Sequence, residues 1–216
     1  MALGVGMRLV AILGGCLLFC SGLLLANGPE LEFKAVDAAY AKDASDYSNI
    51  WRESGSLIVS ELEGATGASL DEQRIEVIVF EGMSRSGGGS EPMKLRASYA
   101  ADVKRATLVH ELGHRYLDAA GIEPGCVAEV HDVLSLVLFG VWANLWGEKF
   151  ALEQAAVESE RSERYRQSWA KVLPLSAQER RVRLEEFWSS CRRLTMCSSR
   201  PRNCHFAWSN FAAAAA

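Results

Sequence analysis

Residues 107–115 read TLVHELGHR, and this stretch constrains the fold and the chemistry of the 216-residue chain more than any other. In a helix, His110 and His114 lie on the same face one turn apart, so both imidazoles can bind one Zn²⁺ at about 2.0–2.1 Å. Glu111 lies beside them and can take a proton from a water molecule that the metal activates. The stretch therefore predicts a zinc site.

The helix that carries this motif is expected to span Ala101–Ala119 and to be buried. Leu108 and Leu112 flank the histidines with apolar side chains, and buried polar groups need partners, which a metal would supply. Gly113 costs about 1 kcal/mol relative to alanine in a helix. Its presence indicates that another element packs closely against this face.

The residues before this helix predict a short sheet. Arg74–Glu81 is rich in β-branched residues and is expected to be a strand, followed by a loop at Ser84–Pro92. Met93–Tyr99 alternates apolar and polar residues, as a half-exposed edge strand does. Further upstream, Gly28–Tyr40 is expected to be irregular or weakly helical, and Ser56–Glu63 has helical spacing.

The residues after the motif predict further helices. Val127–Trp146 is almost wholly apolar, so we expect a helix that is buried on most sides. Glu148–Leu173 is expected to form one longer polar helix, and Ser176 with Glu179 forms a capping box that starts another. The predicted fold class is a small α+β domain, with a short mixed or antiparallel sheet over the motif helix and C-terminal helices behind it.

The first 26 residues have the pattern of an export signal. Arg8 precedes the uncharged apolar run Leu9–Ala26. Three fates stay open: cleavage after Ala26, acylation of Cys16 at a lipobox-like sequence, or retention as a membrane anchor. We therefore expect an exported protein that is periplasmic, secreted or membrane-anchored, with membrane association through this segment.

The rest of the chain is expected to be one domain over residues 28–198, followed by a disordered tail over 199–216. The net charge is −4 with no basic stripe, which argues against a nucleic-acid partner. Four cysteines remain after the first 26 residues and could form two disulfides in three pairings. They are Cys126, Cys191, Cys197 and Cys204.

The order of strand, loop, edge strand and His-Glu-Leu-Gly-His helix resembles the core of the zincin metallopeptidases, particularly the compact gluzincin-like ones. The resemblance covers about Arg74–Trp146. It implies that His110 and His114 are zinc ligands, that Glu111 is the general base, and that a third ligand comes from the following helix. It also implies that Met93–Tyr99 pairs with an extended substrate. The extended metzincin motif is absent, since no histidine stands six residues after His114.

Three residues are candidates for the third ligand: Glu129, His131 and Asp132. The resemblance favours Glu129, because glutamate is the usual ligand in that family. We favour His131, because Ser135 one turn later could orient its ring. Residues 129 and 131 point to nearly opposite sides of a helix, so only one of them can reach the metal.

These residues predict a zinc metallopeptidase that hydrolyses peptide bonds in peptide or protein substrates, with Glu111 as general base. Tyr99, Tyr116 and His205 are candidate hydrogen-bond donors to the tetrahedral intermediate. The alternative is a non-catalytic envelope binding protein with a structural zinc site, which a fourth protein ligand would indicate. A third option is a metal-free helical scaffold in which the motif is accidental.

Overall fold

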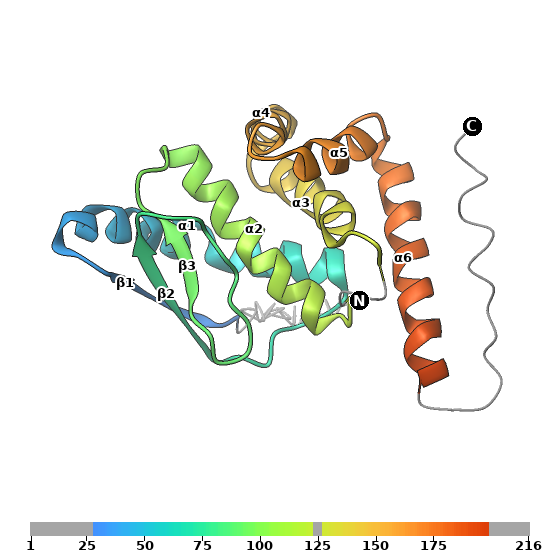
Figure 1. Cartoon of the computed structure of the whole chain (residues 1–216), viewed down its shortest axis with the longest axis horizontal. Helices are drawn as coiled ribbons and strands as arrows, with labels where there is room; N and C mark the ends of the chain where they lie inside the picture. Colours follow the sequence, from blue (N-terminus) through green and yellow to red (C-terminus); the bar gives the residue numbers. More distant parts are fainter. Residues whose placement is uncertain (1–27, 123–126, 199–216) are drawn as a thin grey trace, which may run out of the picture.

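The computed structural model describes residues 28–122 and 127–198, with the backbone alone for 192–198. The described residues form an α+β domain with one small sheet and a larger set of helices (Figure 1). The predicted fold class is thus confirmed. The predicted signal or anchor, with Cys16, and the predicted tail, with His205, lie outside the described residues.

The sheet is parallel. Its strands follow the order β1 (Glu30–Ala35), β2 (Arg74–Phe80) and β3 (Met93–Arg96), and both neighbouring pairs run in the same direction. The expectation of a mixed or antiparallel sheet was therefore wrong. The β2 strand matches its prediction within one residue, whereas β3 ends three residues before the predicted Tyr99.

The strand β1 corrects the prediction that residues 28–40 are irregular or weakly helical. Its apolar residues Leu31, Phe33 and Ala35 alternate with charged ones and pack into or against the core. Parallel neighbours need a crossover connection, and the helix α1 (Ala41–Thr66) with the short turn η1 (Ala38–Tyr40) supplies it between β1 and β2. The predicted helix at Ser56–Glu63 is one part of α1.

The other helices are α2 (Ala101–Ala119), α3 (Val130–Trp146), α4 (Glu148–Ser159), α5 (Glu163–Val172) and α6 (Ala177–Ser198). In Figure 1, α2 runs between the sheet and the C-terminal helices, and α1 passes behind α2. The α3 helix packs against α1, α2, α4, α5 and α6, which confirms that it is buried on most sides. Within the described residues, no helix combines the length and hydropathy needed to span a membrane.

The predicted single helix Glu148–Leu173 is two helices. The first ends at Ser159, and Ser162 starts α5 as its N-cap, with its hydroxyl accepting a hydrogen bond from the backbone N–H of Tyr165 at 3.3 Å. The break lets α5 fold back on α3, where Trp169 stacks on Trp142 with ring centroids 5.6 Å apart. It therefore determines which side chains α5 brings to the interior.

The capping box that was predicted for α6 is present. The backbone N–H of Ser176 donates to Glu179 Oε2 at 2.7 Å, and the backbone N–H of Glu179 donates to Ser176 Oγ at 3.2 Å. These two bonds pair backbone donors that the first turn of a helix otherwise leaves unsatisfied. The α6 helix runs on to Ser198, ten residues beyond the predicted approach to Trp188.

Candidate metal centre

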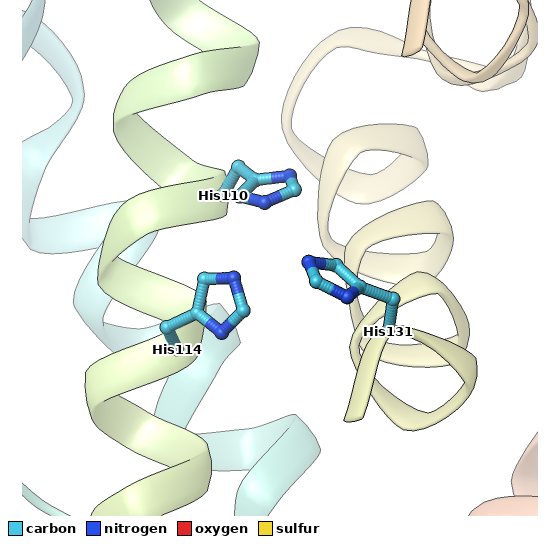
Figure 2. A group of neighbouring side chains, drawn as sticks. All are labelled: His110, His114 and His131. Carbon is cyan, nitrogen blue, oxygen red and sulfur yellow. The ribbon is translucent and has the colours of Figure 1, made fainter. Parts of the chain in front are cut away.

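Three histidines from two helices point at one another. His110 and His114 extend from one face of α2, and His131 extends towards them from the first turn of α3 (Figure 2). One ring nitrogen from each can be chosen so that all three lie within 4.8 Å of one another. The group is largely buried, and it could hold a metal ion.

The close approach of α2 and α3 is what completes the group. A Cβ atom on Gly113 would lie 2.8 Å from Leu134 Cδ1, so Leu134 packs directly on the backbone of α2 and would have to shift for a side chain here. This is the close packing that the sequence indicated. Gly113 directly precedes His114, and Leu134 lies one turn after His131, so the contact lies next to two of the three histidines.

Glu129 orients His131 and does not join the histidine group. As N-cap of α3, its Oε1 accepts hydrogen bonds from the His131 backbone N–H at 3.2 Å and from His131 Nδ1 at 2.8 Å. His131 Nε2 is thereby left for a metal. None of the described hydrogen bonds joins Ser135 to His131, so the carboxylate takes the place that was expected of Ser135.

Asp132, the remaining candidate for the third ligand, faces α5. Its Oδ1 accepts a hydrogen bond from Ser168 Oγ at 2.8 Å, and its Oδ2 lies 2.7 Å from Lys171 Nζ. These contacts join the start of α3 to α5. Among the three candidates, His131 is the one whose donor atom lies with those of His110 and His114.

Glu158, at the end of α4, makes the corresponding contact with His110. Its Oε1 lies 2.7 Å from His110 Nδ1, and its Oε2 accepts a hydrogen bond from Trp169 Nε1 at 3.1 Å. Sequence reasoning missed both Glu158 and Trp169. No local pattern marks them, because Glu158 is 48 residues from His110 and lies on a helix that reads as polar and solvated.

A metal binds the neutral form of histidine, and the surroundings favour this form for His114 and His131 but not for His110. The pKa of His114 is lowered to about 3, mainly by burial and in addition by the neighbouring His110 and His131. Burial also lowers the pKa of His131, against the opposing effect of Glu129. Burial acts in the same direction on His110, but the charge and hydrogen bond of Glu158 outweigh it and raise the pKa. A proton therefore competes with a metal more strongly at His110 than at the other two histidines.

Glu111 is buried beside the group, with 5% of its surface exposed. The pKa of its carboxyl is raised to about 7, mainly by burial; His110 and Arg161 lower this pKa, and Glu158 raises it. A carboxyl with such a pKa can both accept and return a proton near neutral pH.

Tyr165 lies against the group from α5 and was not among the predicted residues. Its ring centroid is 5.7 Å from that of His110 and 4.7 Å from that of His131. Of the predicted donors, Tyr99 lies under the Arg161 guanidinium at 5.2 Å from its ring centroid, near the site. Tyr116 is fully buried with no hydrogen-bond partner for its hydroxyl among the described residues.

The outer edge of β3 is already paired. Lys94 and Arg85 exchange two backbone hydrogen bonds of 2.8 and 2.9 Å, in an antiparallel bridge. The Arg96 N–H donates to Ser84 Oγ at 3.1 Å, and the Arg96 carbonyl accepts from Tyr47 Oη at 2.9 Å. A substrate could pair with this edge only if residues 84–86 moved away, so the expected pairing of the edge strand with substrate is not available here.

The loop that covers β3 is held by Arg115 of the motif helix. This buried side chain donates to the carbonyls of Ser86 at 2.8 Å and Glu91 at 2.7 Å, and it pairs with Glu72 at 2.8 Å. Gly87 fits between these groups with φ +65°, and a Cβ there would lie 2.6 Å from the Glu91 carbonyl oxygen. The loop therefore has a defined conformation that the hydrogen bonds of Arg115 hold against the rest of the fold.

A hollow of about 500 Å³ between α1 and residues 99–105 includes Tyr99 and Lys104 in its wall. A smaller one of about 240 Å³ lies between the start of α3 and α5, with Glu129 and Arg164 in its wall. Neither is lined by the three histidines. Buried donor atoms that converge are a stronger sign of a functional site than a hollow in the surface.

Comparisons of the chain with protein-family models, with curated proteins and with solved structures found no match. The function is therefore inferred from the residues of this chain and their geometry.

Proposed function

We propose that the chain is a zinc-dependent metallopeptidase that hydrolyses peptide bonds in peptide or protein substrates. The observation that carries this proposal is the buried group of His110, His114 and His131 with Glu111 beside it. Three protein ligands with one open position are the donor set of catalytic zinc sites. Two of the ligands and the acidic residue come from one helical turn, as the zincin resemblance implies.

Zinc is the metal that this donor set suits best. Imidazole nitrogen is a good ligand for zinc, copper, iron and nickel, whereas calcium and magnesium prefer oxygen. Two carboxylic acids close to the group, Glu111 and Glu158, are buried. Buried carboxylates need a compensating cation, and a divalent ion bound by the three neutral histidines would supply it.

The residues divide the work of hydrolysis between them. A bound Zn²⁺ would act as a Lewis acid on the scissile carbonyl and make a water molecule acidic enough to attack at neutral pH. Glu111 takes the proton from the attacking water on a carboxylate oxygen and later passes it to the leaving amine. Glu129 and Glu158 hold the rings of His131 and His110, each with Nδ1 towards its carboxylate.

The alternative is a non-catalytic binding protein with a structural zinc site. A structural site has four protein ligands and no open position. In the part of the chain that the structure describes, no cysteine, aspartate, glutamate or further histidine joins the three histidines. This favours the enzyme over the binding protein.

We further propose that the protein is exported and held at or beyond a membrane by its first 26 residues. The sequence pattern of that segment is the main support. Cys191 is buried and disulfide-bonded, which fits an oxidising compartment.

The proposal is tested with the zinc-loaded full chain and a diverse peptide library whose cleavage is followed by mass spectrometry. Glu111→Gln should keep one zinc per chain and lose about 10²–10⁴-fold in the rate of cleavage, because the proton acceptor is removed while the histidines stay. Glu160→Gln removes an exposed carboxylate nearby and should change neither quantity. A wild-type chain that holds one zinc and cleaves no peptide would support the binding protein instead.

A further inference from the structure

We infer that Glu158, anchored by Trp169, is a positioning residue that holds His110 with Nδ1 protonated and Nε2 turned towards the metal. The inference rests on the metal site of the proposed function and adds to it a part from outside the motif. It assigns a role at the metal site to α4 and α5, which carry Glu158 and Trp169.

The carboxylate of Glu158 meets one donor with each oxygen. Oε1 lies 2.7 Å from His110 Nδ1, and Oε2 lies 3.1 Å from Trp169 Nε1. A carboxylate can only accept hydrogen bonds, so the His110 proton is on Nδ1 and the lone pair for a metal is on Nε2. The bond from Trp169 occupies the other oxygen and so holds the carboxylate in place beside His110.

Burial distinguishes this contact from an ordinary surface ion pair. Glu158 is 1% exposed and Trp169 is fully buried. Among the described residues, the cation that pairs with Glu158 is Arg161, whose Nη1 lies 3.7 Å from Oε1 and whose Nη2 donates to Thr107 at 3.3 Å. A carboxylate is costly to bury unless it is paired. The fold carries that cost at a position where the charge faces a candidate metal ligand, His110.

The same arrangement occurs in weaker form at His131. Glu129 bonds His131 Nδ1 at 2.8 Å, but its side chain is 27% exposed and it also pairs with Arg164 at 3.1 Å. Two of the three histidines thus present Nε2 under the control of a carboxylate. Because water screens the Glu129 contact, Glu158 should have the larger effect on metal affinity.

Glu158→Gln tests whether Glu158 positions His110 or only fills space. Glutamine keeps the shape of the side chain but has one acceptor oxygen for two donors, His110 Nδ1 and Trp169 Nε1. If its oxygen accepts from Trp169, its amide N–H groups face His110 Nδ1. His110 then favours the tautomer with the proton on Nε2. In that tautomer Nε2 has no lone pair for a metal, and the lone pair on Nδ1 faces the glutamine. We expect the affinity for Zn²⁺, measured by competition with a chromophoric chelator, to fall about 10–100-fold.

A second substitution should reverse part of this loss. Trp169→Phe in the Glu158→Gln background removes the competing donor, so the glutamine oxygen can turn to His110 Nδ1. The double variant should bind Zn²⁺ more tightly than Glu158→Gln alone. Trp169→Phe on its own should weaken binding much less than Glu158→Gln. A merely structural role for Glu158 predicts the opposite order, with the double variant weakest.

The measurements use the full chain in a mild detergent, with circular dichroism to show that each variant is folded. The visible absorption of the Co²⁺-substituted protein should change in Glu158→Gln and return towards wild type in the double variant. Glu160→Gln, two residues away and exposed, should match wild type throughout. Equal Zn²⁺ affinity of wild type and Glu158→Gln would overturn the inference and leave the metal site standing. A wild type that binds no Zn²⁺ would overturn both.

Discussion

At the scale of single residues, the identity of the third zinc ligand can be tested by mutation. The family resemblance favours Glu129, whereas the geometry of the site favours His131. His131 lies with His110 and His114, whereas Glu129 contacts the ring of His131 from behind. His131→Ala should therefore reduce the zinc content from one per chain to well below one. Glu129→Ala should keep the zinc and lower the free energy of unfolding by about 1 kcal/mol, because α3 loses its N-cap.

Elemental analysis of the two variants after passage through a desalting column gives the zinc content, and urea unfolding gives the stability. His110→Ala serves as the reference for a lost ligand. Zinc that stays in His131→Ala and leaves in Glu129→Ala would assign the ligand to the glutamate, as the family resemblance suggests.

The core of this site was predictable because its residues are close in sequence. The spacing of His110 and His114 places both on one helical face whatever surrounds them. The sequence could name His131 as a candidate ligand but could not decide between it and Glu129. The structure favours His131, because Glu129 is the N-cap of α3 and its carboxylate binds the His131 ring. Glu158 and Tyr165 were not predictable, because their burial depends on the break at 160–162, which one capping residue, Ser162, produces.

At the scale of secondary-structure elements, the contact between α2 and α3 should control metal affinity. Gly113→Val places side-chain atoms where Leu134 Cδ1 lies, 2.8 Å from an added Cβ, and should push the two helices apart. Overpacking of this kind costs about 1–3 kcal/mol of stability. Zinc affinity should fall by at least about tenfold, since His131 moves away from the motif helix.

Gly140 provides the matched control for Gly113. Gly140 lies in α3, the helix that α2 contacts through Gly113, but a Cβ added to Gly140 meets no atom within 4 Å. Gly140→Ala should leave zinc affinity unchanged and raise stability by up to about 1 kcal/mol, through helix propensity alone. Unchanged zinc affinity in a folded Gly113→Val would show that the helix separation does not set the geometry of the site.

A buried lysine joins α2 to α1 and gives a second prediction at this scale. Lys104 Nζ lies 2.6 Å from Asp43 and 2.9 Å from Asp46, and the lysine side chain is 4% exposed. The aspartates are partly exposed, at 26% and 34%. Asp43→Asn with Asp46→Asn should cost about 3 kcal/mol or more, because a buried ammonium loses its counter-charges. Lys104→Met should stay within about 1 kcal/mol of wild type, since water can solvate the aspartates.

The pH dependence of the Asp46→Asn variant checks the charge directly. Hydrogen bonds from Lys104, and then from Lys42, hold the pKa of Asp46 below its ordinary value of 3.8. A lowered pKa in the folded state stabilises the fold above the ordinary value, and this contribution disappears as the pH falls through the folded pKa. In urea unfolding, the difference between wild type and Asp46→Asn should stay constant down to about pH 5 and shrink below 3.8. A difference that does not shrink would mean that the charge of Asp46 is not the cause.

The strand β1 shows why the elements themselves were only partly predictable. Helices such as α2 follow from local periodicity, and the predicted bounds of α2 agree with the structure residue for residue. The β1 strand has only three apolar residues, and its pairing partner β2 begins 44 residues after β1 begins. Without β1 there is no strand–helix–strand unit in the sequence, and so the parallel direction of the sheet could not be inferred.

At the scale of the whole molecule, the metal site lies where separate parts of the fold meet. Two ligands are on α2 and one is on α3, while Glu158 on α4 and Tyr165 on α5 close around them. The sheet and α1 hold α2 from the other side. A metal at this point therefore connects the two halves of the domain, and its binding should stabilise the native state as a unit.

The thermal stability of the chain should accordingly depend on zinc. A ligand that binds only the native state at about 100 times its Kd stabilises it by about 2.7 kcal/mol, which for a chain of this size raises Tm by about 5–10 °C. We expect that rise when Zn²⁺ is added to chelator-treated protein in differential scanning fluorimetry. His114→Ala removes one ligand of the histidine group and leaves the cysteines unchanged, so its Tm should not rise. An equal rise of Tm in wild type and in His114→Ala would mean that the stabilising zinc binds at another site, because loss of a ligand from the histidine group would then have no effect.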